Sequence, residues 1–230
     1  MISESGLPRF RIGLGYLTLS QGHGMKRSER LLFGPVSAAI FCIGVACLAL
    51  MVPGYNHVHQ TVSEIGEVGS PARIPFTVML ACVCICTLIF ASAIRDISSQ
   101  AGRSRVAAYL TICSGLSALG VGIFAYPHPL HNVFGLSEII GYQAPLALAL
   151  AWRSDPNAKA LVVSSWVLFA LLWIAMALNL SPLFPHSWLW AHLKPVNGLV
   201  QRSLFLSWFA WCTIAGVLMW RQEQGSLHFR

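Results

Sequence analysis

The side chains best suited to chemistry gather in one polar segment, residues 53–75, between two long apolar segments. The segment reads PGYNHVHQTVSEIGEVGSPARIP and contains His57, His59, Ser63 and Glu64. Imidazole and carboxylate groups transfer protons and bind metal ions, and a serine hydroxyl acts as a nucleophile or caps a helix. We therefore expect this segment to form a polar cap with two shorter loops on the same side of an apolar frame.

Histidines are concentrated in the loops expected on this side. Six of the eight histidines lie there, two in each of three loops: His57, His59, His128, His131, His186 and His192. Three imidazoles can hold a zinc ion and leave one position open for water, whose pKa then falls to about 7. We predict His59, His131 and His192, one from each loop, as the zinc ligands. The spacing is not that of a compact motif such as His-Glu-x-x-His, so ordinary loop histidines are the alternative.

Glu138 lies inside an otherwise apolar segment. A carboxylate at such a position costs on the order of 3 kcal/mol, so it should face protein or a water-filled cavity. Pro129 is a natural helix start, and His131 and Glu138 are seven positions apart. This spacing places them on one helical stripe, about 10 Å apart along the axis. We expect them to line one wall of a cleft; a structural hydrogen bond from Glu138 to a neighbouring helix is the alternative.

Arg202 lies one turn inside the last apolar segment. A guanidinium at this depth must pair with a partner or extend to the interface. Its predicted partners are Glu138, Glu64 or an anionic lipid headgroup, and anchoring at the interface is the alternative. The predicted catalytic residues of the cap are thus Ser63, Glu64, Glu138 and Arg202.

Ser63 also has a structural interpretation. A serine followed by acids can cap a short interfacial helix, here one that runs to Gly66 or Gly69. Glu64 would then support folding rather than chemistry.

The composition sets the fold class. Apolar residues make up 56% of the 230 residues, charged residues only 10%, and the mean hydropathy is +0.65, which excludes an ordinary soluble domain. We predict an all-α, polytopic membrane protein, because helices satisfy their own backbone in lipid and the apolar runs do not alternate like barrel strands. The six predicted spans are Leu31–Val52, Phe76–Ile94, Val106–Tyr126, Leu136–Trp152, Leu161–Leu180 and Leu199–Trp220.

Basic residues predict the orientation. The N-terminus, two short turns after the second and fourth spans, and the C-terminal tail carry twelve of the fifteen Lys and Arg residues, whereas the opposite loops carry only Arg73 and Lys194. The positive-inside rule therefore places both termini in the cytoplasm and the protein in the cytoplasmic (inner) membrane. The predicted divisions are a cytoplasmic segment over 1–30, a six-helix domain over 31–220 and a cytoplasmic tail over 221–230.

The first thirty residues have two interpretations. Leu7 to Leu19 can form an amphipathic segment on the inner membrane surface. Alternatively, Met25 is the true start and the preceding residues are dispensable. The sequence does not decide between them.

The expected partners are membrane lipids and either a protein partner or a second copy of the chain. The net charge of +7 is a topology signal and attracts anionic lipid, and no basic stripe with interleaved exposed aromatics indicates nucleic-acid binding. All seven cysteines fall inside spans, so no disulfide framework is expected. Cys82, Cys84 and Cys86 do not share one helix face, which favours packing over metal binding.

Several short motifs together resemble a known family. They are Pro53-Gly54-Tyr55, the block His59 to Gly66, Gly122 to Pro127, His131 with Gly135, and Gly198 to Arg202. Over about Leu31 to Trp220 the chain is similar to the domain of unknown function 998 family, and this resemblance implies a six-span membrane protein whose activity is not established. The family often has an Asp after the Phe and Pro at the end of the third span. This chain has Ala125-Tyr126-Pro127-His128 there, so a carboxylate role at that position is not expected.

The sequence is compatible with three functions. The first is an accessory membrane subunit whose polar cap binds a lipid or a partner. The second is an intramembrane, metal-dependent lipid hydrolase or transferase, with zinc as the metal. The third is a transporter of a small amphiphile or ion, with Glu138, Tyr142, Gln143 and Arg202 lining a pocket and Pro145 breaking the fourth span.

Overall fold

The computed structural model describes residues 25–228, and these form helices joined by turns. The predicted amphipathic segment from Leu7 to Leu19 lies outside the described residues. The α-helices are α1 (Arg27–Leu31), α2 (Phe33–Ala49), α3 (Val62–Ile65), α4 (Arg73–Gln100), α5 (Val106–Ile123), α6 (Pro129–Gly141), α7 (Ala144–Trp152), α8 (Lys159–Asn179), α9 (Trp188–Leu193) and α10 (Asn197–His228). Three short 3-10 helices join them: η1 (Pro156–Ala158), η2 (Ser181–Leu183) and η3 (Lys194–Val196).

Six helical segments of the described chain are long and apolar enough to cross a membrane, which confirms the predicted number. They are Arg27–Ala49, Arg73–Gln100, Val106–Ile123, Pro129–Trp152, Pro156–Leu183 and Trp188–Gly225. Hydropathy misplaced several boundaries, because helices continue through polar turns. The fourth span begins at Pro129 rather than at Leu136, since proline at the first helical position needs no hydrogen bond and His128 Nδ1 accepts from the Leu130 N–H.

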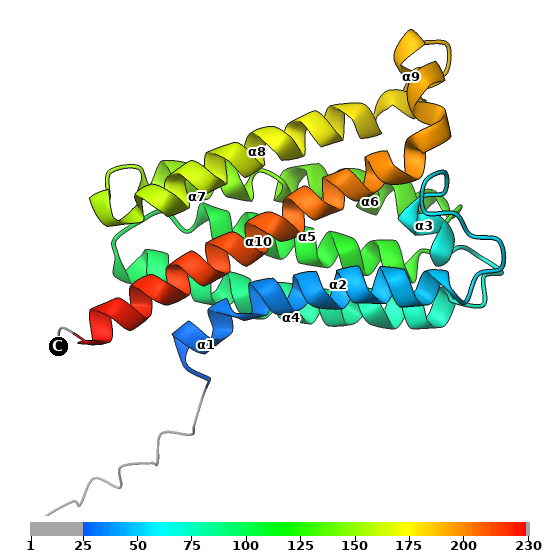
Figure 1. The fold of residues 1–230 in the computed structure, drawn as a ribbon. Helices are drawn as coiled ribbons and strands as arrows, with labels where there is room; N and C mark the ends of the chain where they lie inside the picture. Colours follow the sequence, from blue (N-terminus) through cyan, green and yellow to red (C-terminus); the bar gives the residue numbers. More distant parts are fainter. Residues whose placement is uncertain (1–24, 229–230) are drawn as a thin grey trace, which may run out of the picture.

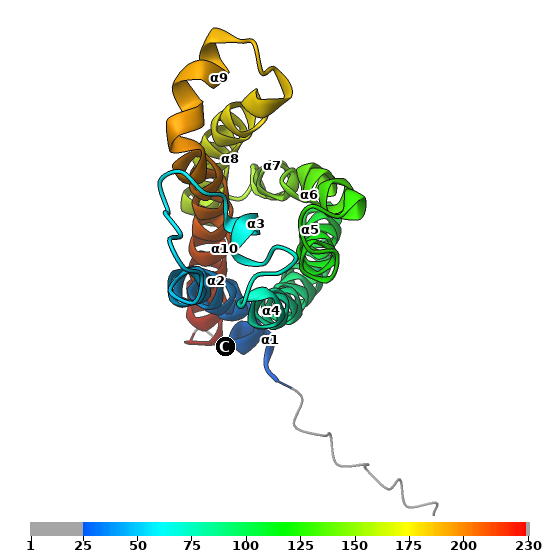
Figure 2. The ribbon, with the colours of Figure 1, turned by 90° about the vertical axis from the view of Figure 1, so that its right-hand side faces the viewer.

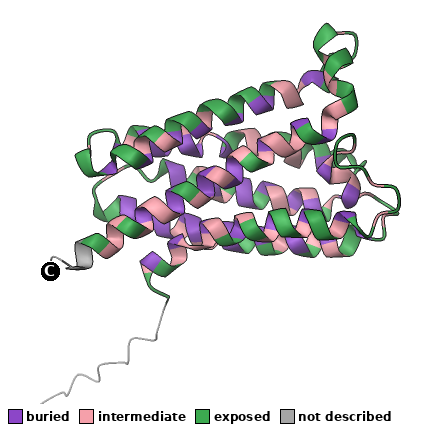
Figure 3. Cartoon of the chain, in the orientation of Figure 1, coloured by how far each residue is buried: buried purple, intermediate pink, exposed green. Residues whose placement is uncertain are grey.

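The spans form a ring (Figures 1 and 2). Neighbours follow the order α2, α4, α5, α6 with α7, α8 and α10, and α10 closes the ring against α2. Buried residues face the inside of the ring, whereas exposed ones face outward (Figure 3). The outward residues include large apolar side chains such as Ile74, 75% exposed, and Leu206, 57% exposed. This pattern is typical of helices that face lipid.

The end of the ring near the termini is closed tightly. α2 and α10 approach closely there, because Gly34 has no side chain; a Cβ atom at this position would collide with the backbone of Cys212. Arg30 donates to Asp96 at 2.7 Å and to Ser92 at 2.8 Å. α10 continues to His228, so the helix extends beyond the predicted end of the last span at Trp220.

The fourth span is broken, as Pro145 predicted. α6 ends at Gly141 and α7 begins at Ala144, and Pro145 stands in the first turn of α7, where it supplies no N–H. Both halves of this span pack on α5 and the second half also packs on α8, and α8 lies farther from α2 and α4 at the end of the ring where α3 lies (Figure 1).

Candidate functional site

A cavity of about 540 Å³ occupies the end of the ring where α3 lies. It lies between α6 on one side and α8 with α10 on the other, and α3 forms part of its wall. Its polar lining residues are Thr61, Ser63, Glu64, Tyr126, His131, Asn132, Glu138, Tyr142, Asn179, Asn197 and Gln201. The volume falls in the range of about 300–1,000 Å³ that is usual for small-molecule sites.

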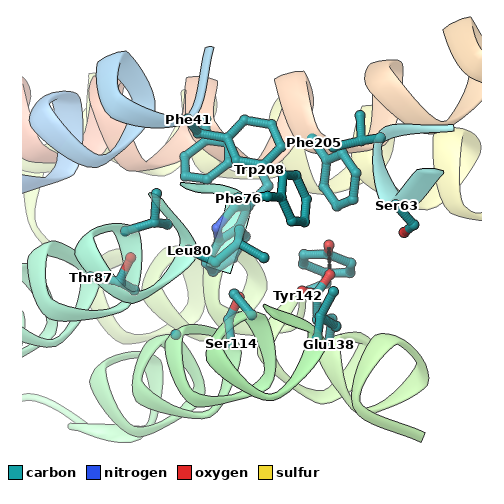
Figure 4. Close-up of a pocket in the computed structure, with 16 residues that line it drawn as sticks. Phe41, Ser63, Phe76, Leu80, Thr87, Ser114, Glu138, Tyr142, Phe205 and Trp208 are labelled. Carbon is teal, nitrogen blue, oxygen red and sulfur yellow. Dashed lines mark hydrogen bonds between the residues drawn. The ribbon is translucent and has the colours of Figure 1, made fainter. Parts of the chain in front are cut away.

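A narrow apolar chamber of about 40 Å³ adjoins this cavity deeper in the bundle. Five residues line both spaces: Ser63, Val121, Glu138, Tyr142 and Phe205. Figure 4 shows the chamber between aromatic side chains, with Ser63, Glu138 and Tyr142 at one end. Its remaining walls are almost entirely apolar, including Phe41, Phe76, Leu80, Trp208 and Phe209. A polar cavity thus adjoins an apolar chamber.

Ser63 and His131 form a hydrogen-bonded pair in the cavity wall. The Ser63 Oγ lies 3.1 Å from His131 Nε2. The other ring nitrogen, Nδ1, lies 2.9 Å from the carbonyl oxygen of Phe124 and 3.2 Å from that of Val121. Carbonyl oxygens only accept hydrogen bonds, so Nδ1 carries the proton and Nε2 accepts from the serine hydroxyl. His131 is only 7% exposed, which keeps this arrangement fixed.

Glu138 and Tyr142 form the second polar pair of the cavity. The Tyr142 hydroxyl donates to Glu138 Oε2, one turn away on the same span. Both side chains line both spaces, so Glu138 does face a cavity, on the same wall as His131. The predicted alternative, a hydrogen bond from Glu138 to a neighbouring helix, is absent among the described residues.

Glu64 has a folding role at the start of α3. Its Oε1 accepts from the Thr61 N–H at 3.1 Å and from the Thr61 hydroxyl at 2.9 Å. Thr61 is the N-cap residue, and α3 ends at Ile65 with Gly66 as its C-cap. The predicted short helix to Gly66 is therefore confirmed, but the prediction of Ser63 as its cap was wrong. The β-branched Thr61 takes the extended cap conformation, which leaves Ser63 free to reach His131.

Arg202 joins the long loop between α2 and α4 (residues 50–72, which include α3) to the start of α10. Its Nη1 donates to the carbonyl oxygens of His57 and Gln60, both at 2.8 Å, and of Gly198 at 2.9 Å. Its Nη2 donates to the Tyr55 hydroxyl at 2.6 Å and to His57 Nδ1 at 2.9 Å. The predicted pairing with Glu138 or Glu64 was wrong, because carbonyl oxygens of the loop and of Gly198 surround the guanidinium and accept its hydrogen bonds.

This network changes the acidity of two loop residues. Burial, and then the positive charge of Arg202, lower the pKa of His57. Burial raises the pKa of Tyr55, and the hydrogen bond and charge of Arg202 oppose part of that rise. The imidazole of His57 is neutral when it accepts from Arg202, so the contact depends on pH.

The family described as a protein of unknown function, DUF998, matches residues 35–218. The chain belongs to the DUF998 family. No curated protein and no solved structure matches it. The matched residues include every residue that lines the two spaces.

The histidines of this DUF998 protein lie with different partners. His59 Nδ1 contacts the carbonyl oxygen of Pro195, and His192 Nδ1 lies 2.8 Å from that of Trp188 in its own helix. Both are exposed, whereas His131 is buried against Ser63. Within residues 25–228 no group of three or more His, Cys, Asp or Glu residues is placed to hold a metal ion. The arrangement therefore does not bring His59, His131 and His192 together as zinc ligands.

Sequence reasoning missed several polar residues of the DUF998 cavity. Gln201 Oε1 accepts from the Val62 N–H at 2.5 Å and fixes the start of α3 on α10. Asn132, Asn179 and Asn197 also line the cavity. Asparagine and glutamine are common near the ends of spans, so none of these four residues stands out by itself. Only their shared position near helix ends could have indicated a site.

Proposed function

We propose that this DUF998 protein binds an amphiphilic molecule from the surrounding bilayer, with the polar group in the outer cavity and the apolar end in the chamber. The observation that carries the proposal is that two spaces of different character adjoin and share five lining residues, one lined by amides, carboxylates and an imidazole and the other by aromatic rings. A molecule with one polar and one apolar end matches this division.

Access from the lipid phase supports the same conclusion. Leu136 on α6 and Leu183 after α8 line the cavity and are 53% and 65% exposed. Apolar side chains that are both exposed and at the edge of a cavity suit a ligand that arrives through the bilayer rather than through water.

The charge distribution supports one orientation of the protein in the membrane. Basic residues at the end opposite the cavity favour both termini in the cytoplasm, an inner-membrane location and a cavity on the extracytoplasmic side. The protein then serves as a lipid-binding accessory subunit of that membrane.

Photo-cross-linking tests the binding role. The full chain is reconstituted in phosphatidylcholine liposomes with lysophosphatidylcholine that carries a diazirine at the end of its acyl chain. We expect adducts on chamber residues of α4 or α10, such as Leu80 or Trp208. Ala118→Phe fills the chamber and should reduce these adducts at least five-fold.

Leu116→Phe is the matched control, because Leu116 lies on the same helix and is 49% exposed. It should leave the chamber adducts unchanged. Adducts confined to outward residues, or equal chamber adducts in Ala118→Phe and Leu116→Phe, would overturn the proposal.

A further inference from the structure

From the geometry of Ser63 and His131 we infer that this pair is a nucleophile and base for the cleavage of acyl esters at the mouth of the chamber. The inference rests on the proposed binding of an amphiphile, and it specifies the ligand as one whose acyl chain is joined to its polar group by an ester. It requires no metal ion.

The hydrogen-bond directions are those that nucleophilic catalysis needs. The two backbone carbonyls at Nδ1 fix the tautomer, so the lone pair of Nε2 points at the Ser63 hydroxyl proton at a heavy-atom distance of 3.1 Å. A base within about 2.6–3.2 Å of the nucleophile, itself oriented by a third group, is the general arrangement of activated serines. Here backbone carbonyls take the place of a carboxylate.

The position of the pair matches the position of an ester. Ser63 lines both the polar cavity and the apolar chamber, and His131 lines the cavity. In an amphiphile bound across the two spaces, the ester carbonyl lies where polar and apolar parts meet. Figure 4 shows Ser63 at the same end of the chamber as Glu138 and Tyr142.

Donors for the developing oxyanion line the same cavity. The side chain of Gln201 uses its oxygen to accept from Val62, the residue before Ser63, and its amide nitrogen makes no hydrogen bond to the described residues. Asn132, one residue after His131, lines the cavity as well. Such amide groups stabilise the negative charge of a tetrahedral intermediate.

The reaction balances without a cofactor. The Ser63 Oγ forms a bond to the ester carbonyl carbon, and its proton moves to His131 Nε2. The carbon–oxygen bond to the alcohol breaks, and that alcohol leaves with the proton from His131. Water then attacks the acyl-serine with His131 as base, releases the fatty acid and restores the hydroxyl; a second alcohol in place of water gives acyl transfer.

The first test is covalent labelling of the full chain in liposomes with a fluorophosphonate that bears an alkyl chain. The serine oxygen attacks phosphorus, fluoride leaves, and the mass of the peptide that contains Ser63 increases. We expect complete loss of this label in Ser63→Ala and about a 100-fold slower reaction in His131→Gln, in line with the usual contribution of a general base. Ser187→Ala is the matched control, because Ser187 caps α9 at the same end of the bundle, and it should label like the wild type.

The second measurement separates this inference from the proposed binding role. Fatty acid release from lysophosphatidylcholine and diazirine cross-linking are followed on the same Ser63→Ala sample. Loss of release with retained chamber cross-linking supports the catalytic pair. A wild-type protein that cross-links in the chamber but neither labels at Ser63 nor releases fatty acid overturns it and leaves the binding role standing. Absence of chamber cross-linking in the wild type overturns both.

Discussion

Arg202 offers the sharpest test of how the cavity wall is held in place. Besides its pH-dependent contact with His57 Nδ1, three of its hydrogen bonds cross from α10 to the loop between α2 and α4: those to the carbonyl oxygens of His57 and Gln60 and to the Tyr55 hydroxyl. Arg202→Met keeps much of the apolar stem and removes all of them. The loop that carries α3 would then lose its main attachment to α10.

The magnitude follows from the three bonds. A hydrogen bond to a charged group contributes about 1.5–3 kcal/mol when water is excluded, and about 1 kcal/mol when water can replace it. Arg202 is partly exposed, so we take the lower value and expect a loss of about 3 kcal/mol. For a chain of this size that corresponds to a fall in the melting temperature of roughly 6–12 °C. Arg202→Lys keeps one donor group but not the planar fork, so it should lose roughly half as much.

The assay measures thermal unfolding of the detergent-purified protein, with size-exclusion chromatography to monitor the fraction that stays folded at each temperature. Arg73→Met is the control. Arg73 is an exposed arginine on the same side of the bundle, and its replacement should leave the melting temperature within about 2 °C of the wild type, as for most surface changes. The reasoning fails if Arg202→Met unfolds at the wild-type temperature, or if Arg73→Met destabilises the protein as much.

Three further predictions concern the cavity end of the molecule and the orientation of the chain in the membrane. Glu64→Ala removes the acceptor for two Thr61 hydrogen bonds and should cost about 1 kcal/mol, seen as a melting temperature roughly 2–4 °C lower, whereas Glu64→Gln should cost less. The pKa of His57 is lowered from 6.5 in the folded protein, so the unfolded state binds the His57 proton more tightly. The contribution of neutral His57 to the free energy of unfolding should therefore be fully present above pH 6.5 and be lost as the pH falls from there towards the folded pKa. His57→Ala should flatten that dependence in melting curves between pH 5 and pH 8. A cysteine at Gly69 should react with an impermeant maleimide from the extracytoplasmic side and one at Gly102 should not; the reverse result would invert the predicted orientation.

The fold was largely predictable because lipid imposes simple rules on a chain. Runs of apolar residues long enough to cross a bilayer identified all six spans, and Pro145 marked the break in the fourth. Boundaries were less accurate where helices continue through polar residues. Arg73 and Gln100 both belong to α4, although hydropathy alone places them in loops.

The candidate site was only partly predictable. Glu138 and His131 could be placed on one wall because a single helix fixes their spacing. The partners of Arg202 and Ser63 could not, since they depend on how the loop before α4 folds back over the bundle. Arg202 binds loop carbonyl groups and Ser63 binds His131, 68 positions away. Every residue has a backbone carbonyl group, so the sequence does not indicate which carbonyl groups will bind a side chain.

The break in the fourth span gives the cavity a floor at a defined depth. α6 has 13 residues and is therefore about 20 Å long, which exceeds the apolar thickness of one leaflet, about 15 Å. The Tyr142 side chain at the end of α6 stands at that level, where the cavity meets the chamber, and the Trp208 ring packs 5.3 Å from it. An acyl chain that begins near Ser63 passes these rings before it enters the chamber of about 40 Å³, so the size of the chamber sets how much of the chain can enter.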